Sequence, residues 1–408
     1  MPVYLLGTLD TKGVEVAYVR DRLAELNVTV RIVDTGCLGE ASIAANISRE
    51  AVFKAAGTSL EQLRQQADRG QAVTDAAIGA ANLIAEAYAR GDVDGVLALG
   101  GSAGTTIGTA AMRALPLGVP KLMVSTLASG QTRPYVGGKD IMMFSSVVDI
   151  AGLNRITRTV LDNATLAMSG MIQNRSRLKQ QSDQLDRPLI AATMFGVTTP
   201  CVDQARKILE QAGYEVMVFH ATGNGGEAME SLIEDGLFAG VLDLTTTELA
   251  DELVGGILTA GPTRLTAAGR RGVPQVISVG ALDMVNFGPV ATIPEKFKDR
   301  KFYQHNPTVT LMRTTVEENR KLGEEIGRKA AAATGPTCIM IPLKGVSAID
   351  QAGKAFDDPA ARKALFDGIR ANHANVELVE LDHGINDQGF AEAAAQKLLE
   401  LIGRCFSA

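Results

Sequence analysis

The chain has 408 residues, of which 46% are hydrophobic, only 4% are aromatic and 42 are glycines. This length predicts two or three domains with sizeable cores. A formal net charge of −6, with no basic stretch that contains interleaved aromatic residues, argues against nucleic acid as a partner. No apolar run approaches the roughly 20 residues of a membrane span, and the N-terminus is too short and uncharged for a signal peptide. We therefore expect a cytoplasmic protein with no membrane partner.

The first 173 residues alternate between strand-like and helix-like segments, as expected when helices pack on a parallel sheet. Apolar runs predict strands at 3–7, 28–33, 93–99 and 120–125. Helical periodicity predicts helices at 14–26, 48–56, 59–69, 71–90, 105–115 and 147–172. A turn at 7–13 and a long glycine-rich loop at 129–140 complete this half.

A polar, charge-rich segment, 174–187, ends at Pro188 and predicts a linker between two domains, 1–173 and 188–408. The second domain is expected to contain strands at 189–193, 214–219, 240–244, 338–342 and 376–381. Its predicted helices are 202–212, 316–332, which starts at a capping box, and 390–401. Residues 286–306 read as a long irregular segment, a length that is usually functional or interfacial.

Several landmarks occur in the same order in both halves. The triplet 34–36 after the second strand has a counterpart at 221–223, and the Gly-Val-Pro at 118–120 has one at 272–274. We therefore predict an α/β protein made of two tandem Rossmann-like, doubly wound domains with mostly parallel sheets.

The most informative motif is the turn 100–106, Gly-Gly-Ser-Ala-Gly-Thr-Thr, which follows an apolar strand and precedes a predicted helix. Glycine lets backbone N–H groups approach a ligand, and a helix N-terminus offers unpaired N–H donors and a positive dipole. The turn therefore suits a phosphate. It also spells G-x-S-x-G, the nucleophile elbow of α/β hydrolases with Ser102 as nucleophile. Both interpretations remain open at this point.

A second loop, at the end of the first strand, is expected to flank the same site, since ligands in open α/β sheets bind at the carboxyl ends of the strands. Asp34, after the second strand, stands where such folds place an acid for a ribose hydroxyl. Neither G-x-G-x-x-G nor a Walker A motif is present. The predicted nucleotide-binding residues are Gly7, Thr8, Asp34, Gly100, Gly101, Ser102, Gly104, Thr105 and Thr106.

Other polar residues are weaker candidates. Lys12, Arg133 and Lys139 can meet a phosphate or carboxylate, or simply be solvated. Asp10, Asp140 and Asp149 are candidate carboxylates for Mg²⁺ or for a base. The cluster at 382–387, with His383, reads either as part of a site or as an Asx-rich turn before the last helix.

The cysteines and histidines predict no dedicated metal site. The four cysteines have no C-x-x-C spacing, and no two of the four histidines are four residues apart. The thiols are therefore expected to be reduced, as in the cytosol. Cys201, just before a predicted helix, can have a depressed pKa or be a small packed residue.

Four segments together, 7–13, 100–105, 145–154 and 383–387, are similar to those of the Tm-1-like ATP-binding domain family, UPF0261, over essentially the whole chain. The chain looks like a bacterial member that resembles the N-terminal part of the longer plant proteins. This resemblance implies two Rossmann-like domains, ATP binding and self-association. It implies no established catalytic activity.

Three functions follow as hypotheses. The first is a nucleotide-binding protein that uses ATP, alone or with Mg²⁺, as an ATP-dependent enzyme that acts on an unknown small molecule at a cleft between the domains. The second is a serine hydrolase, in which Asp243 or Asp283 and His305 or His383 complete a triad with Ser102. The third is a non-catalytic, two-lobed sensor of a small molecule. Apolar residues on more than one face of 145–172 predict a homodimer.

Overall fold

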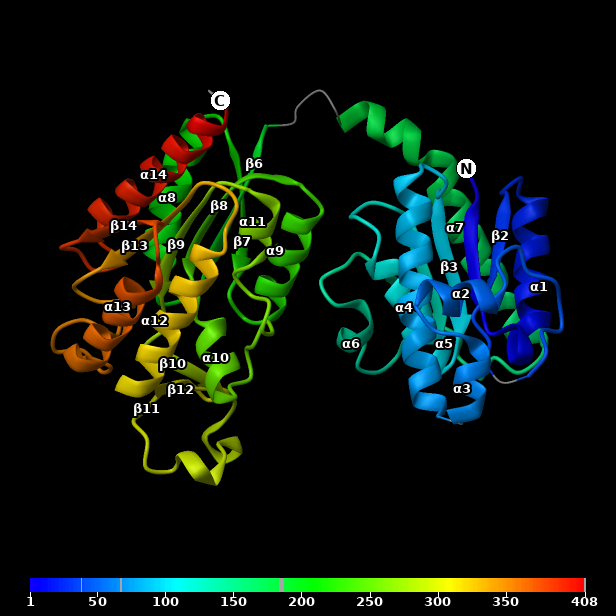
Figure 1. Cartoon of the computed structure of the whole chain (residues 1–408), viewed down its shortest axis with the longest axis horizontal. Helices are drawn as coiled ribbons and strands as arrows, with labels where there is room; N and C mark the ends of the chain where they lie inside the picture. The colour runs from blue at the N-terminus through cyan, green and yellow to red at the C-terminus, as the bar shows by residue number, and fades with distance from the viewer. Residues whose placement is uncertain (38, 67, 183–186, 407–408) are drawn as a thin grey trace. The chain divides into compact units, whose positions relative to one another are not determined.

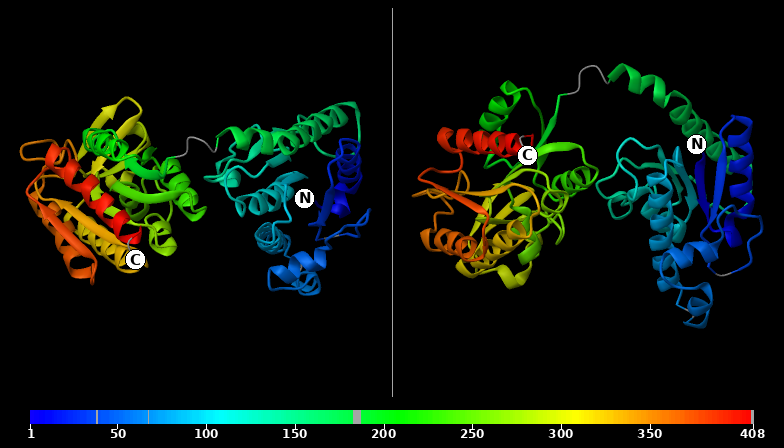
Figure 2. Two further views of the ribbon diagram at one scale, coloured as in Figure 1. Left: turned by 90° about the horizontal axis from the view of Figure 1, so that it is seen from above. Right: turned by 45° about the horizontal axis from the view of Figure 1, so that its top comes forward.

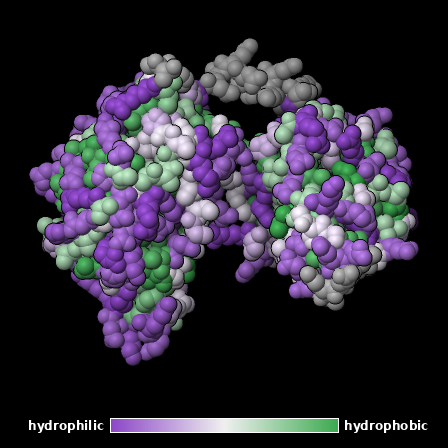
Figure 3. Space-filling model, viewed as in Figure 1, coloured by the Kyte–Doolittle hydropathy of each residue, from purple (hydrophilic) through white to green (hydrophobic). Residues whose placement is uncertain are grey.

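The computed structural model describes residues 1–37, 39–66, 68–182 and 187–406. The chain forms two compact units, Met1–Leu185 and Asp186–Ala408, each built on its own parallel sheet (Figure 1). Hydrophilic residues cover most of the visible face of both units, with scattered hydrophobic ones among them (Figure 3). Among the described residues, no helix is long and apolar enough to span a bilayer.

The first unit contains a five-stranded parallel sheet in the order β2-β1-β3-β4-β5. Its strands are β1 (Val3–Gly7), β2 (Val30–Asp34), β3 (Gly95–Gly100), β4 (Lys121–Ser125) and β5 (Met142–Ser145). Its helices are α1 (Leu9–Glu25), α2 (Arg49–Ala55), α3 (Leu60–Gln66), α4 (Arg69–Ala89), α5 (Ser102–Arg113), α6 (Arg133–Val136) and α7 (Arg155–Ser182).

Helices cover both faces of this sheet because successive side chains of β1 and β3 alternate between two cores. Tyr4 and Leu6 pack with α2, α4 and α5, whereas Val3 and Leu5 pack with α1 and α7. The views in Figure 2 show the same two layers of helices. The unit is therefore doubly wound, as the sequence predicts.

The second unit contains a six-stranded parallel sheet in the order β14-β13-β9-β8-β6-β7. Its strands are β6 (Leu189–Met194), β7 (Glu215–His220), β8 (Phe238–Thr245), β9 (Gln275–Gly280), β13 (Thr337–Pro342) and β14 (Glu377–Leu381). Its helices are α8 (Thr199–Gln211), α9 (Asn224–Glu234), α10 (Glu248–Val254), α11 (Ala267–Arg271), α12 (Val316–Ala331), α13 (Pro359–Asn372) and α14 (Gln388–Phe406). In both sheets the first strand lies between the second and the third, so the two units share one winding order.

A small antiparallel sheet in the second unit differs from the sequence expectation. Its order is β10-β12-β11, from β10 (Met284–Phe287), β11 (Phe302–Asn306) and β12 (Val309–Arg313). Two short 3-10 turns, Val290–Thr292 and Glu295–Phe297, lie between β10 and β11. The segment 286–306 therefore contains regular structure where an irregular loop was predicted.

The predicted linker also has a different structure. Helix α7 continues to Ser182 and so covers most of 174–187, while 183–186 lie outside the described residues. The capping box at Thr315 is confirmed, because its hydroxyl accepts from the Glu318 N–H and the Glu318 carboxylate accepts from the Thr315 N–H.

Candidate functional site

A cavity of about 230 Å³ opens at the carboxyl edge of the first sheet. Strands β1 and β3 are neighbours there, but α1 and α5 leave them toward opposite faces of the sheet. This is the switch point of the topology, where α/β folds bind ligands. The lining residues come from four segments: Thr8, Asp10, Thr11, Lys12, Thr35, Cys37, Arg69, Val73, Gly101, Ser102, Ala103, Gly104 and Ile107.

The N-terminus of α5 contributes three backbone donors to this cavity. The helix begins at Ser102, and its N-cap, Gly101, has no side chain to accept a hydrogen bond. The first amide bonded within the turn is that of Thr105, which donates to the Gly101 carbonyl at 2.8 Å. The N–H groups of Ser102, Ala103 and Gly104 have no acceptor among the described residues. Since the first turn holds no acidic residue, its unpaired donors and dipole favour an anion.

The glycines of this motif serve different purposes. A Cβ on Gly100 would lie 2.6 Å from the Gly104 Cα, and one on Gly108 would lie 2.6 Å from the Ala98 Cβ. These glycines let α5 lie close against β3. Gly101 is different, because the nearest atom to its Cβ position, the Thr126 Oγ1, is 3.7 Å away. Packing within the protein therefore does not require a glycine at 101. Because Gly101 lines the cavity and has no side chain, a ligand can approach its backbone closely.

Two cationic side chains line the same cavity. Lys12 lies where α1 departs from helical geometry, with φ −127° and ψ 15°, and its Nζ donates to the Ile150 carbonyl. Arg69 is the exposed first residue of α4 and makes no ion pair among the described residues. Asp10 is the one carboxylate among the described residues of the lining, and its Oδ2 accepts from the Gly39 N–H at 3.1 Å. The balance of charge therefore favours an anionic ligand.

Asp34 is buried beneath the loops rather than in the cavity. Its Oδ1 accepts from the N–H groups of Leu9, at 3.1 Å, and Gly36, at 2.9 Å. Its Oδ2 receives the Arg49 Nε at 2.7 Å. Only 2% of Asp34 is exposed, and a ribose hydroxyl would have to replace one of these bonds. The geometry instead gives Asp34 a positioning role, since it ties the start of α1 to the loop after β2.

The other predicted residues divide into two groups. Thr8, Gly101, Ser102 and Gly104 line the cavity. Gly7, Gly100, Thr105 and Thr106 do not. The Thr105 hydroxyl is buried against the Ser125 hydroxyl at 2.6 Å, and that of Thr106 donates to the Ser102 carbonyl at 3.0 Å.

Sequence reasoning missed Thr35, Cys37 and Arg69, which also line the cavity. Thr35 and Cys37 follow β2, so the rule that ligands meet the carboxyl ends of strands could have included them. Arg69 carries no such signal, because it reaches the cavity only through the placement of α4. Arg133 and Lys139 are not among the lining residues.

A triad with Ser102 would need residues from both units. Ser102 lies in the first unit, whereas all four histidines, between 220 and 383, and both candidate acids lie in the second. Both candidate acids already accept hydrogen bonds. Asp243 receives the Arg264 guanidinium and the Thr193 hydroxyl, and the Asp283 Oδ2 receives the Ser347 hydroxyl at 2.8 Å.

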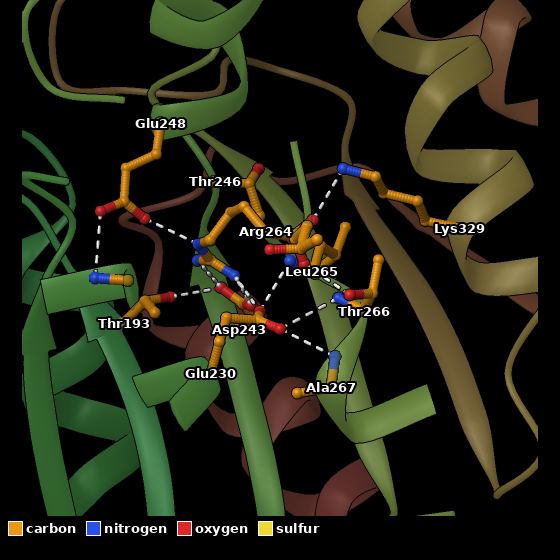
Figure 4. Close-up of polar contacts among 12 residues, drawn as sticks. Thr193, Glu230, Asp243, Thr246, Glu248, Arg264, Leu265, Thr266, Ala267 and Lys329 are labelled. Atoms are coloured by element: carbon orange, nitrogen blue, oxygen red, sulfur yellow. Dashed lines mark hydrogen bonds and ion pairs between the residues drawn. The ribbon is translucent and has the colours of Figure 1, made fainter. Parts of the chain in front are cut away.

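The corresponding strand of the second unit ends in an acidic, internally satisfied cluster (Figure 4). Helix α10, after β8, begins with Glu248, whose Oε1 accepts from the Gly223 and Gly226 N–H groups. The fully buried Arg264 joins Glu248, at 2.7 Å, to Asp243. Burial raises the pKa of Glu248. The helix that follows the third strand therefore begins with a carboxylate residue in the second unit, whereas in the first unit it begins with unpaired amides.

Cys201 and the cluster before α14 each had two interpretations. Burial raises the pKa of Cys201 to about 12, which favours the packed residue over a thiol with a depressed pKa. In the cluster before α14, the Asp387 Oδ2 accepts from the Gly384 N–H at 2.7 Å, and Asn386 donates to the Val197 carbonyl at 2.9 Å. The first bond closes the turn, and the second ties it to the loop after β6.

Family models match both units. The N-terminal domain of uncharacterised protein family UPF0261 matches residues 1–177, and its C-terminal domain matches 187–402. The chain belongs to the UPF0261 family. A UPF0261 protein of Clostridium tetani is 50% identical over 403 residues, which is 98% of each chain.

A plant protein and solved structures are also among the proteins to which this chain is similar. The ToMV resistance protein Tm-1(GCR237) of Solanum lycopersicum is 40% identical over 98% of this chain, which spans 55% of that protein. The structure of MnaA from S. aureus with UDP aligns with 93% of this chain and over 100% of its own length. The sequence identity is 11% and the TM-score is 0.21. So low a similarity carries no argument about function.

Proposed function

We propose that the first unit binds a nucleotide, ATP, through its phosphates in the cavity between α1 and α5. The supporting observation is the uncapped start of α5, which turns three unpaired amide donors toward a cavity that also holds Lys12 and Arg69. Backbone donors and a positive dipole at a helix N-terminus suit a phosphate, and the lysine adds a point charge.

The size of the cavity limits what it encloses. At about 230 Å³ it lies below the roughly 300–1,000 Å³ of pockets that bury whole drug-sized ligands. It therefore suits the phosphate chain, with the nucleoside outside. Mg²⁺ typically uses one or two carboxylates together with phosphate oxygens and waters, so Asp10 fits a Mg²⁺ that arrives with the ATP.

A matched set of ligands tests this proposal by thermal shift. ATP and inorganic triphosphate should both raise the Tm, whereas adenosine should not. At about 100 times the Kd, binding adds about 2.7 kcal/mol of stability, which is roughly 5–10 °C for a unit of this size. Measurements with and without Mg²⁺ separate the contribution of Asp10. If neither ATP nor triphosphate raises the Tm at millimolar concentration, the proposal is wrong.

We further propose a cytoplasmic homodimer. All four cysteines are free thiols, as is usual in a reducing compartment. The exposed side of α7 carries apolar side chains that the first unit does not cover, including Ile156 and Leu166.

A further inference from the structure

A second cavity, of about 320 Å³, lies in the second unit at the carboxyl ends of β6 and β7. Its volume is within the usual range for a small-molecule site. Lining residues come from the loop after β6, the end of β7, the segment after α10 and the β11–β12 hairpin: Phe195, Gly196, Val197, His220, Thr222, Leu258, His305, Asn306, Val309 and Leu311. The edge of a parallel sheet is again the place where a ligand is expected.

The walls of this cavity are held in place by backbone hydrogen bonds. The Leu258 N–H donates to the buried Asp251 carboxylate at 3.3 Å. The Val197 carbonyl accepts from Ala348 N–H, at 3.0 Å, and from Asn386. The hairpin is paired through β12 to β10. An ordered wall of this kind lets a ligand bind without first ordering loops.

The two histidines of the cavity differ from the other two in the chain. His373 Nδ1 bonds the Val376 carbonyl at 2.8 Å, and His383 lies 3.6 Å from Asp387. The imidazoles of His220 and His305 have no hydrogen-bond or ion-pair partner among the described residues. Every imidazole carries at least one N–H donor, whatever its protonation state. His220 and His305 are both exposed, so their imidazoles offer uncommitted N–H donors beside the apolar residues of the lining.

We propose that this cavity binds a small organic monocarboxylate with an apolar or aromatic body. The carboxylate would accept hydrogen bonds from the His220 and His305 imidazoles, and the body would pack against Val197, Leu258 and Val309. Among the described residues, no aspartate, glutamate, lysine or arginine lines the cavity, so no carboxylate in the lining repels an anion. A single negative charge also costs less to remove from water than the two charges of a phosphate monoester. This site is separate from the nucleotide cavity and does not depend on it.

Histidine NMR on the full chain tests the proposal with benzoate as the probe. Four histidines give four imidazole Cε1–H signals, which His→Gln variants assign. Benzoate should shift the signals of His220 and His305 and leave those of His373 and His383 in place. Benzamide has the same shape without the charge and should bind at least about tenfold more weakly.

Histidine-to-glutamine variants test whether each imidazole contributes to benzoate binding. His220→Gln and His305→Gln should each weaken benzoate binding about tenfold, whereas the matched surface variant His383→Gln should not change it. The proposal is overturned if benzoate shifts all four signals alike or none of them. It is also overturned if benzamide binds as well as benzoate, because the cavity would then select shape and not charge.

Discussion

Ser102 stands at the first position of α5, where one negative charge has opposite effects on stability and on binding. An aspartate there would satisfy the helix dipole and should stabilise the first unit by about 0.3–1 kcal/mol. The same charge would repel a phosphate from the three free amides. We therefore expect Ser102→Asp to raise the Tm of the free protein while it lowers ATP affinity by at least about tenfold.

Ser102→Asn is the matched control, since asparagine has nearly the same shape as aspartate but no charge. Titration calorimetry should show that Ser102→Asn keeps most of the wild-type affinity for ATP. Wild-type affinity in Ser102→Asp would remove the α5 N-terminus from the binding site.

Gly101 tests the close approach of backbone to ligand. Its Cβ position is open within the protein, so Gly101→Val should fold with little loss of stability. Because Gly101 lines the cavity, the added side chain should crowd the phosphates and abolish nucleotide binding. Gly403→Val is a suitable control, because Gly403 also has open space around its Cβ position but lies on α14 in the second unit. A folded Gly101→Val protein with unchanged ATP affinity would contradict the proposed site.

Asp34 separates the prediction from sequence from the role that the structure gives it. A ribose contact predicts that Asp34→Ala weakens ATP binding more than triphosphate binding. The buried pair with Arg49 leads instead to a loss of about 3–5 kcal/mol of stability, because a buried guanidinium would lose its partner. We expect the Tm to fall and both ligands to weaken alike. A selective loss of ATP binding would restore the ribose role.

At the scale of elements, most of the parallel strands were predictable, whereas the antiparallel strands and the parallel edge strand β5 were not. Buried strands such as β3 read as continuous apolar runs because both of their faces are covered. Strand β11 is mostly exposed, and its polar residues gave no such run. Helix α7 continues through the polar segment that predicted a linker, because a helix does not need an apolar stripe on every turn.

Non-local contacts explain the remaining differences. Helix α1 begins at Leu9, five residues before the predicted start, and the Leu9 N–H is bonded by Asp34 from another strand. Periodicity within a helix cannot show such a bond. The turn at Gly101 carried its own signal, whereas Arg69 could be assigned to the same cavity only from the packing of α4.

Two buried aspartates, Asp251 on α10 and Asp283, should make the free energy of unfolding of the second unit depend on pH. Burial raises the pKa of Asp251 from 3.8 to about 7. Between these values the folded state holds a proton that the unfolded state has lost, so the free energy of unfolding falls as the pH rises from about 4 to about 7. At 1.36 kcal/mol per pKa unit, the change amounts to about 3–5 kcal/mol. Asp283, whose pKa burial also raises to about 7, adds to the same slope.

Urea unfolding at pH 5 and pH 8 measures this effect. Asp251→Asn should reduce the difference between the two conditions, since an amide does not titrate. The exposed Asp299→Asn should leave it unchanged. A difference that is the same in Asp251→Asn and in the wild type would show that Asp251 titrates normally.

For the whole molecule, the two units repeat one winding order but treat the same structural position differently. The helix after the third strand starts with free amides in the first unit, and with Glu248 bonded to Arg264 in the second. Carboxylates at that position would repel a phosphate. The cavity proposed for a carboxylate in the second unit lies elsewhere, at the ends of β6 and β7 and beneath the antiparallel hairpin. This difference supports a phosphate site in the first unit and a site for another class of anion in the second.

Self-association belongs to the same scale and can be tested on α7. Val160, Leu161 and Met168 are buried on the core of the first unit, whereas Ile156 is 49% exposed and Leu166 is 56% exposed. Two-fold pairing is the commonest way in which soluble proteins cover such a surface. Sedimentation at low micromolar concentration should therefore give about twice the chain mass of 43.0 kDa.

A charge on the exposed side of α7 should abolish that pairing. We expect Leu166→Glu to sediment as a monomer with an unchanged circular dichroism spectrum, because Leu166 contributes little to the core of its own unit. Ile78→Glu is the matched control, since Ile78 on α4 is 47% exposed and should leave the dimer intact. A wild-type protein that sediments as a monomer would end the dimer proposal. A Leu166→Glu protein that stays dimeric would place the interface on another surface.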